Sequence, residues 1–380
     1  MNPENEQTFL LNNLLRNRID RSNGWIPFDL FFNTVMYEPG LGYYSSGSYK
    51  IGEGGDYTTA PEISKYFSKS IANQTLRLLD MHDSPSVIEI GAGKGTFAFE
   101  YLKALRETKT EIEHYYILEI SADLRDRQMQ LISSLPEDLR NKVTWLESLD
   151  IEPIDGIVLA NEVIDALPFK RFCIENKQVY ELGITYSDGA FKVSKKESSK
   201  KLRDQVEAIS VEIERKIEDG FTSEIRLDFH KWFRSISSLI RKGSMIFIDY
   251  GYDRNDFYRT ERSSGNMICH YQNQIIQDPL KNIGQQDISA SVDFTQLANS
   301  AIKEGFFIDL YTTQSMFLLS EQSLSMIMDI EKDEERIMEI QKLKQLVMPN
   351  QMGDVFKCMV MGKGISPDNF EELSHLNHTL

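Results

Sequence analysis

Cysteine is scarce in this chain of 380 residues, and its three cysteines, Cys173, Cys269 and Cys358, are widely separated. An odd and scattered set has neither the spacing of a zinc site nor that of a disulfide framework, so we expect no metal site and a reducing compartment. The six histidines form no HExxH pattern, and no nucleophile elbow occurs. These absences argue against a metalloprotease and against a serine hydrolase.

Long hydrophobic runs are also missing. No apolar run in the sequence approaches the ~18 residues that a transmembrane helix needs, so we expect no membrane partner. The first 17 residues lack the continuous apolar core of a secretory signal and predict an amphipathic helix instead. From these features we expect a cytoplasmic protein.

Basic residues are outnumbered, with 42 Lys and Arg against 58 Asp and Glu and a formal net charge of −16. Affinity for a nucleic acid backbone requires clustered Lys and Arg, so we expect no nucleic acid partner. The acidic balance permits a basic protein substrate. Solubility alone also accounts for an excess of acidic residues, and we prefer that interpretation.

The most informative segment is VIEIGAGKGTF, at positions 87–97. A short apolar run ends in Gly91, Ala92 and Gly93, and a helical pattern follows from Thr96. This order of strand, glycine turn and helix is typical of a nucleotide-like cofactor held at a helix N-terminus. The G-x-G-x-G spacing differs from the dinucleotide fingerprint and is similar to motif I of class I S-adenosylmethionine methyltransferases. The alternative is a simple tight turn between strand and helix.

A second carboxylate supports the cofactor interpretation. Glu119 ends the apolar run that begins at Tyr115, and it lies 26 positions after Gly93. In doubly wound folds the acid that ends the second strand accepts hydrogen bonds from ribose hydroxyls. Glu119 therefore indicates a nucleoside without choosing between NAD and S-adenosylmethionine.

The pattern along the chain predicts an α/β fold, because short apolar strands alternate with helices. Three segments at 170–174, 179–185 and 191–194 predict antiparallel strands instead, joined by turns such as Asp188-Gly189. We expect the polar stretch 251–291 to be a long loop, on the ligand side of the sheet. The strands expected for the sheet are 86–90, 115–119, 143–146, 156–160, 245–249, 306–311 and 355–361.

A polar cluster, Asn161, Glu162 and Asp165, follows the fourth expected strand. Residues at that strand end face the reactive part of a cofactor, where two carboxylates could grip a cationic acceptor and orient it. The structural alternative is a helix N-terminus with Asn161 as the cap and two acids in the first turn. Both interpretations stay open at this point.

The segment GDYTTAPEIS, at 55–64, precedes the glycine turn. Thr59 could cap a helix that has Pro61 at its start and Glu62 in its first turn. The functional interpretation is a loop that closes over the cofactor or acceptor. Glycines at 52, 54 and 55 and the aromatic segment 40–44 favour a mobile lid.

Nine segments, in this order, resemble the MidA-like S-adenosylmethionine-dependent methyltransferases, a family that includes the mitochondrial complex I assembly methyltransferase. The resemblance covers about 28–364, and the segments at 55–64 and 161–168 are specific to the family. The segments are EPGLGYYSSG (38–47), GDYTTAPEIS (55–64), EIGAGKGTF (89–97), LEISADLRDRQ (118–128), LANEVIDALPFKRF (159–172), IDYGY (248–252), DISASVDFTQL (287–297), TTQSMFL (312–318) and MGDVFKCMVMGKG (352–364).

The resemblance implies a class I methyltransferase core, Rossmann-like, with a seven-stranded sheet whose last strand is antiparallel. With it we expect a helical N-terminal and lid segment at 1–84, a core at 85–364 with insertions at 168–235 and 251–293, and a tail at 365–380. We also expect an antiparallel β-hairpin insertion after strand 4. The chain departs from the family pattern at Ser291, where that pattern usually has a histidine.

The resemblance also implies S-adenosyl-L-methionine as the cofactor and a protein arginine as the acceptor. We expect Thr59, Pro61, Glu62, Ala92 and Asn161 to bind the cofactor, together with Gly91, Gly93, Glu119, Ser148 and Leu149. Glu162, Asp165 and Asn161 are the candidate catalytic residues. Two other functions stay open: a cofactor-binding assembly protein with little catalysis, and a methyltransferase of small molecules. An NAD dehydrogenase is disfavoured because no G-x-G-x-x-G occurs. The sequence does not indicate an oligomeric state.

Overall fold

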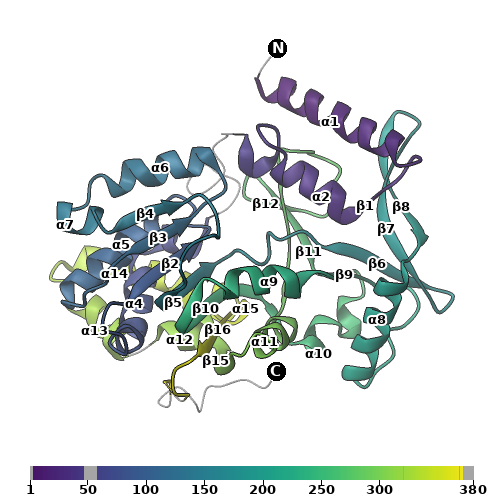
Figure 1. The fold of residues 1–380 in the computed structure, drawn as a ribbon. Helices are drawn as coiled ribbons and strands as arrows, with labels where there is room; N and C mark the ends of the chain where they lie inside the picture. The colour runs from purple at the N-terminus through teal and green to yellow at the C-terminus, as the bar shows by residue number, and fades with distance from the viewer. Residues whose placement is uncertain (1–2, 47–57, 320, 368, 371–380) are drawn as a thin grey trace. The chain divides into compact units, whose positions relative to one another are not determined.

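The chain folds into two compact units, each built from three stretches of sequence. Figure 1 labels the helices and strands of both. The computed structural model describes residues 3–46, 58–319, 321–367 and 369–370. Unit 1 comprises Met1–Tyr57, Ile164–Phe229 and Tyr252–Asp293, and unit 2 comprises Thr58–Val163, His230–Gly251 and Phe294–Leu380. Among the described residues, no helix combines the length and the apolar character that crossing a membrane requires.

Unit 2 contains a mixed β-sheet, which confirms the predicted α/β class. The sheet has eight strands, one more than expected: seven follow the order β15-β16-β10-β5-β2-β3-β4, and the short strand β14 (Val292–Asp293) pairs with β10 off this path. Strands β10, β5, β2, β3 and β4 pair in parallel, whereas β16 pairs antiparallel with both β10 and β15. The strands are β2 (Ser86–Ile90), β3 (Tyr115–Leu118), β4 (Val143–Leu146), β5 (Ile154–Asn161), β10 (Ile240–Tyr252), β15 (Phe307–Thr313) and β16 (Phe356–Lys363).

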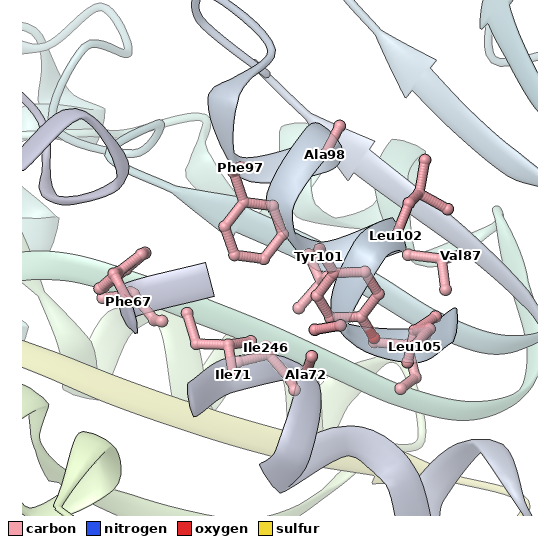
Figure 2. Packing of buried hydrophobic residues seen from close by; sticks show 14 of the residues in the cluster. Phe67, Ile71, Ala72, Val87, Phe97, Ala98, Tyr101, Leu102, Leu105 and Ile246 are labelled. Atoms are coloured by element: carbon pink, nitrogen blue, oxygen red, sulfur yellow. The ribbon is translucent and has the colours of Figure 1, made fainter. Parts of the chain in front are cut away.

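The helices of unit 2 cover this sheet with apolar faces, as expected for parallel strands that are buried on both sides. Figure 2 shows Phe67 and Ile71 of α4 packed near Phe97 and Tyr101 of α5 in the core. The helices are α3 (Ala60–Ile63), α4 (Lys65–Leu79), α5 (Thr96–Glu107), α6 (Ala122–Ile132), α7 (Glu137–Arg140), α9 (Phe229–Ser237), α11 (Phe294–Lys303), α12 (Gln314–Leu318), α13 (Glu321–Met328), α14 (Asp333–Val347) and α15 (Met352–Val355).

Unit 1 contains two smaller antiparallel sheets. One has the order β1-β7-β6-β9 with β8 also paired to β7, and the other has the order β12-β11-β13. The strands of unit 1 are β1 (Ile26–Pro27), β6 (Lys170–Glu175), β7 (Gln178–Ser187), β8 (Ala190–Glu197), β9 (Thr222–Ile225), β11 (Met267–Tyr271), β12 (Gln274–Ile276), β13 (Asp287–Ala290) and β14 (Val292–Asp293).

The N-terminal segment forms the predicted amphipathic helix. Leu11, Leu15 and Ile19 recur every four residues and are buried in the core of unit 1, together with Phe28 and Phe32. A second cluster lies under α8, where Leu202, Val206 and Ile209 are buried. The helices of unit 1 are α1 (Pro3–Arg21), α2 (Phe28–Tyr37), α8 (Lys200–Glu212) and α10 (Arg254–Phe257), with short 3₁₀ turns η1 (Tyr43–Ser45) and η2 (Thr260–Arg262).

The expected loop at 251–291 is wrong, because this stretch contains α10 and all three strands of the smaller sheet. Strands β11 and β12 are joined by Gln272 and Asn273, whose φ angles are +50° and +59°. Two positive φ angles in a two-residue loop are typical of a type I′ hairpin turn, which usually carries Asn-Gly. Without a glycine the sequence lacked the usual signal for this hairpin.

Candidate active site

The glycine turn leaves the carboxyl end of β2, where ligands bind in open α/β sheets. Gly91, Gly93 and Gly95 have φ angles of +68°, +53° and +88°, a region that favours glycine. A Cβ on Gly91 would lie 3.0 Å from Val163 Cγ2, so a side chain there would be crowded as well as strained. Helix α5 begins at Thr96, and no side chain caps its N-terminus. The first backbone N–H groups of α5 can therefore face a ligand.

Glu119 follows β3 and is half-buried beside this turn. Its Oε1 accepts a hydrogen bond from the Ser121 amide at 2.8 Å, and its Oε2 accepts one from Gln128 Nε2 at 3.0 Å. Burial raises the pKa of Glu119, and these hydrogen bonds oppose that shift. An ionised carboxylate has about four acceptor positions, so two such bonds leave capacity for a diol.

Gln128 is a residue of this site that the sequence analysis missed. It is fully buried on α6, and its Nε2 also donates to the carbonyl oxygen of Gly93 at 2.8 Å. Trp145 Nε1 donates to Gln128 Oε1 at 2.9 Å. One side chain therefore ties Glu119 to the glycine turn. The available signal was a glutamine on the helix face that Ile132 shares, where an apolar residue is expected.

Helix α3 brings Glu62 to the same turn. Glu62 Oε1 accepts a hydrogen bond from Thr96 Oγ1, and Lys94 Nζ lies 3.5 Å from Glu62 Oε2. Thr59 occupies the N-cap position of α3 with Pro61 in the first turn, but the Thr59 side chain makes no capping hydrogen bond. The predicted helix start is therefore present without the predicted side-chain cap. Residues 47–57, which include most of the predicted lid, lie outside the described residues.

Glu162 directly follows β5 in a left-handed backbone conformation, with a φ angle of +54°. Its amide donates to the Ile248 carbonyl at 2.9 Å. Its Oε1 accepts hydrogen bonds from the Ala60 amide at 3.4 Å and from Asn161 Nδ2 at 3.2 Å. Such backbone geometry in a non-glycine residue is uncommon and is concentrated at functional sites. The alternative of a helix capped by Asn161 is wrong, because no helix begins in 161–168.

Asn161 supplies a test of whether the site fits a polar cofactor. Its Oδ1 is buried and has no hydrogen-bond partner among the described residues. A buried acceptor without a donor is costly, which indicates a ligand that donates a hydrogen bond there. The glycine turn, Glu119 and Asn161 thus fit a nucleoside with a donor group at its other end.

The remaining candidates are less closely associated with this group. Ser148 and Leu149 follow β4, and Ser148 is exposed with its Oγ accepting from the Asp150 amide at 3.2 Å. Asp165 belongs to unit 1 and is 7% exposed. Its carbonyl oxygen accepts hydrogen bonds from Arg226 and from the Ala290 amide. No group of three or more His, Cys, Asp or Glu side chains in the described parts of the chain could hold a metal ion.

Two hydrogen-bonded pairs of buried polar side chains lie in the core of unit 2. Tyr115 Oη donates to Glu89 Oε2 at 2.7 Å, and Tyr101 Oη lies 2.7 Å from Thr75 Oγ1. Burial raises the pKa of Glu89 to about 8, although the hydrogen bond from Tyr115 opposes this shift. Burial therefore favours the protonated form of Glu89 at neutral pH.

Comparison with known proteins identifies the family. A family model described as "Putative S-adenosyl-L-methionine-dependent methyltransferase" matches residues 70–312, more than half of the chain. The crystal structure of a Burkholderia thailandensis protein bound to S-adenosyl-homocysteine has a TM-score of 0.92 at 28% identity, and the match covers 100% of this chain and 98% of that one. A native crystal structure of a protein from the same organism gives a TM-score of 0.89, with the same identity and coverage.

Two more relatives of this chain are also named methyltransferases. The mitochondrial NDUFAF7 homolog of Drosophila melanogaster, named a protein arginine methyltransferase, is 25% identical over 90% of this chain and 83% of its own length. Human NDUFAF7, named likewise, is 22% identical over 90% of this chain and 81% of its own length. These relatives are mitochondrial by name, which contradicts the expectation of a cytoplasmic protein.

Proposed function

Because the chain belongs to this family of S-adenosyl-L-methionine-dependent methyltransferases, we propose that it transfers the methyl group to a protein side chain, with the arginine guanidinium as the first candidate. Relatives that align over 90% of the chain are named protein arginine methyltransferases. The observation that carries the proposal is the arrangement of Glu162, whose carboxylate is anchored at the end of β5 by Ala60 and Asn161.

We assign cofactor binding to the group around the glycine turn. Gly91, Ala92 and Gly93 would let the main chain approach the cofactor closely, and Glu119 would accept hydrogen bonds from the ribose hydroxyls. Asn161 Oδ1 would accept a hydrogen bond from the amino group of the methionine part. Thr59, Pro61 and Glu62 would border the site from α3, and Ser148 and Leu149 would lie near the adenine. The cofactor supplies an electrophilic methyl group on a sulfonium.

We assign binding of the methyl acceptor to the Glu162 carboxylate. Asp165, three residues along the chain, is the second candidate carboxylate. A guanidinium keeps its charge at neutral pH, because its pKa lies far above 7. A carboxylate pairs with it through two parallel N–H···O bonds and fixes its plane. Since one oxygen of Glu162 already accepts from the Ala60 amide and Asn161, its direction is set before the acceptor arrives.

The proposal is tested by methyl labelling. Purified chain is incubated with methyl-labelled cofactor and undermethylated lysate from its own source, beside Glu162→Ala and the control Glu111→Ala, whose carboxylate side chain is 85% exposed. We expect a labelled protein band with the wild type and the control. Glu162→Ala should lose it while its cofactor affinity, measured by calorimetry, stays within roughly three-fold.

Two results would contradict the proposal. Label confined to small molecules would move the assignment to a metabolite acceptor. Cofactor binding without any labelled product would favour an assembly protein with little catalysis. Acid hydrolysis of the labelled band, followed by amino acid analysis, separates methylarginine from methylated lysine or other side chains.

A further inference from the structure

A buried glutamine of unit 2 joins two parts of the group that we assign to the cofactor. Gln128, on α6, is 0% exposed. Its Nε2 donates to the Gly93 carbonyl at 2.8 Å and to Glu119 Oε2 at 3.0 Å. Its Oε1 accepts a hydrogen bond from Trp145 Nε1, on β4, at 2.9 Å. All four residues belong to unit 2, so one amide links the glycine turn after β2 to the acid after β3 within a single unit.

The chemistry of the three partners allows only one orientation of this amide. The indole N–H of Trp145 can only donate, whereas a main-chain carbonyl and an ionised carboxylate can only accept. The Gln128 carbonyl oxygen must therefore face Trp145, and its two N–H groups serve Gly93 and Glu119. An apolar side chain of similar length could fill the same space, but it would leave both acceptors without this donor.

The glycine turn is shaped for close contact with Gln128. A Cβ on Gly95, whose φ angle is +88°, would lie 3.2 Å from Gln128 Cγ and 3.3 Å from Gln128 Cα. Such contacts are tight, so a side chain at position 95 would press on α6 at this point. The absence of a side chain there lets α6 approach the turn closely enough for the amide to reach the Gly93 carbonyl.

The Glu119 carboxylate is held at both of its oxygens. The Ser121 amide donates to Oε1 at 2.8 Å, and Gln128 donates to Oε2. Burial raises the pKa of Glu119, and these two hydrogen bonds oppose that shift, so they favour the ionised form, which only accepts. With one donor on each oxygen, the plane of the carboxylate is fixed and each oxygen keeps an acceptor position. Two neighbouring hydroxyls can donate to these positions together.

We infer that Gln128 is a positioning residue for recognition of the ribose hydroxyls of the cofactor, because it fixes the plane of the Glu119 carboxylate against the glycine turn. This inference rests on the proposed function, in which Glu119 accepts hydrogen bonds from the ribose. The alternative is that Gln128 only stabilises the fold by satisfying the Gly93 carbonyl. A purely stabilising role would affect every ligand of the site alike, whereas a positioning role would affect only ligands that carry the hydroxyls.

The test is a calorimetric titration of the full chain with two ligands. One is S-adenosyl-homocysteine, to which the Burkholderia thailandensis relative is bound, and the other is its 2′,3′-dideoxy analogue, which lacks both hydroxyls. The variants are Gln128→Met and Trp145→Phe, with Gln314→Met as the matched control. Gln314 is also a 0% exposed glutamine of unit 2, and its Nε2 donates to the Leu346 carbonyl at 2.9 Å. Circular dichroism establishes that each variant is folded.

We expect the wild type to bind S-adenosyl-homocysteine about 10- to 100-fold more tightly than the dideoxy analogue, which leaves the Glu119 oxygens unpaired. Gln128→Met should weaken binding of S-adenosyl-homocysteine by about 10-fold and that of the analogue by no more than roughly two-fold. Trp145→Phe removes only the donor to Gln128 Oε1, so it should show the same selective pattern with a smaller loss. Gln314→Met should keep both affinities within about two-fold of the wild type.

Equal weakening of the two ligands in Gln128→Met, or wild-type affinity for both, would overturn the inference. If Gln128→Met does not fold, the same comparison in Trp145→Phe decides. A wild type that binds both ligands equally would refute the role of Glu119, and the role of Gln128 with it. Selective weakening together with an absence of labelled protein in the methyl-labelling assay would instead refute the protein acceptor and support the inference.

Discussion

At the scale of single residues, the site combines side chains whose roles depend on backbone conformation. Glu162 has the left-handed conformation that glycine favours, and nevertheless carries the carboxylate that Ala60 and Asn161 anchor. A left-handed non-glycine residue costs roughly 1–2 kcal/mol, so the role that we propose for Glu162 comes at a cost in stability.

Two substitutions at Glu162 separate the backbone cost from the side-chain bonds. Both Glu162→Ala and Glu162→Gly remove the carboxylate, and only glycine relieves the strain. After allowing for the extra freedom of glycine in the unfolded chain, we expect Glu162→Gly to be about 0.5–1 kcal/mol more stable than Glu162→Ala. Urea unfolding followed by circular dichroism measures the difference. Equal or greater stability of the alanine variant would show that the left-handed conformation stores no strain.

At the scale of elements, two glycines allow three parallel strands to approach closely. Gly156 of β5 is in register with Gly243 of β10 and with Ser86 of β2. A Cβ on Gly156 would lie 2.1 Å from the Ser86 carbonyl oxygen, and one on Gly243 would lie 1.9 Å from the Gly156 carbonyl oxygen. These contacts are backbone contacts, so no side chain can move away to relieve them.

We therefore expect Gly156→Ala to lower the free energy of unfolding by at least about 3 kcal/mol, through overpacking and backbone strain together. The matched control is Gly305→Ala, where φ is +82° and no atom lies within 4 Å of the added Cβ. Only the backbone term applies there, so about 1 kcal/mol should be lost. Similar losses in the two variants, measured by urea unfolding, would contradict the role given to the close strand contact.

The elements also show what the sequence could predict. The glycine turn at Gly91 and the acid at Glu119 could be predicted from the sequence, because each directly follows a short apolar strand. The hydrogen bonds of Gln128 to the glycine turn and to Glu119 could not be predicted, because the sequence does not show which face of α6 meets the turn. The conformation of Glu162 was equally inaccessible, since no propensity places glutamate at positive φ. The hairpin at Gln272 and Asn273 lacked a glycine signal, and tertiary packing stabilised it nevertheless.

At the scale of the whole molecule, the excess of acidic residues makes the free energy of unfolding depend on pH. With 58 acidic residues and a net charge of −16, the dependence of stability on pH sums over many carboxylates. Glu89 differs from an exposed carboxylate in being buried in the core of unit 2, where Tyr115 on the neighbouring strand donates to it. Comparing the wild type with one variant at this position isolates its contribution from the rest.

Burial raises the pKa of Glu89 from an ordinary 4.5 to about 8 in the folded chain. Below the unfolded pKa both states are protonated, and the contribution of Glu89 to stability is fully present. As pH rises from there towards 8, the unfolded chain ionises while the folded chain keeps its proton, so stability is lost, on the order of a few kcal/mol in all. Above pH 8 the slope from this group vanishes.

Glu89→Gln cannot ionise and escapes this loss. We expect its free energy of unfolding, relative to the wild type, to rise steadily between pH 4.5 and 8 and then to level off. Urea unfolding at a series of pH values measures the difference. Tyr115→Phe removes the hydrogen bond that lowers the pKa of Glu89, so its own loss of stability should extend to higher pH. A constant difference between Glu89→Gln and the wild type across this range would mean that Glu89 ionises in the folded chain with the pKa that it has in the unfolded chain, so that the core would carry a buried negative charge at neutral pH.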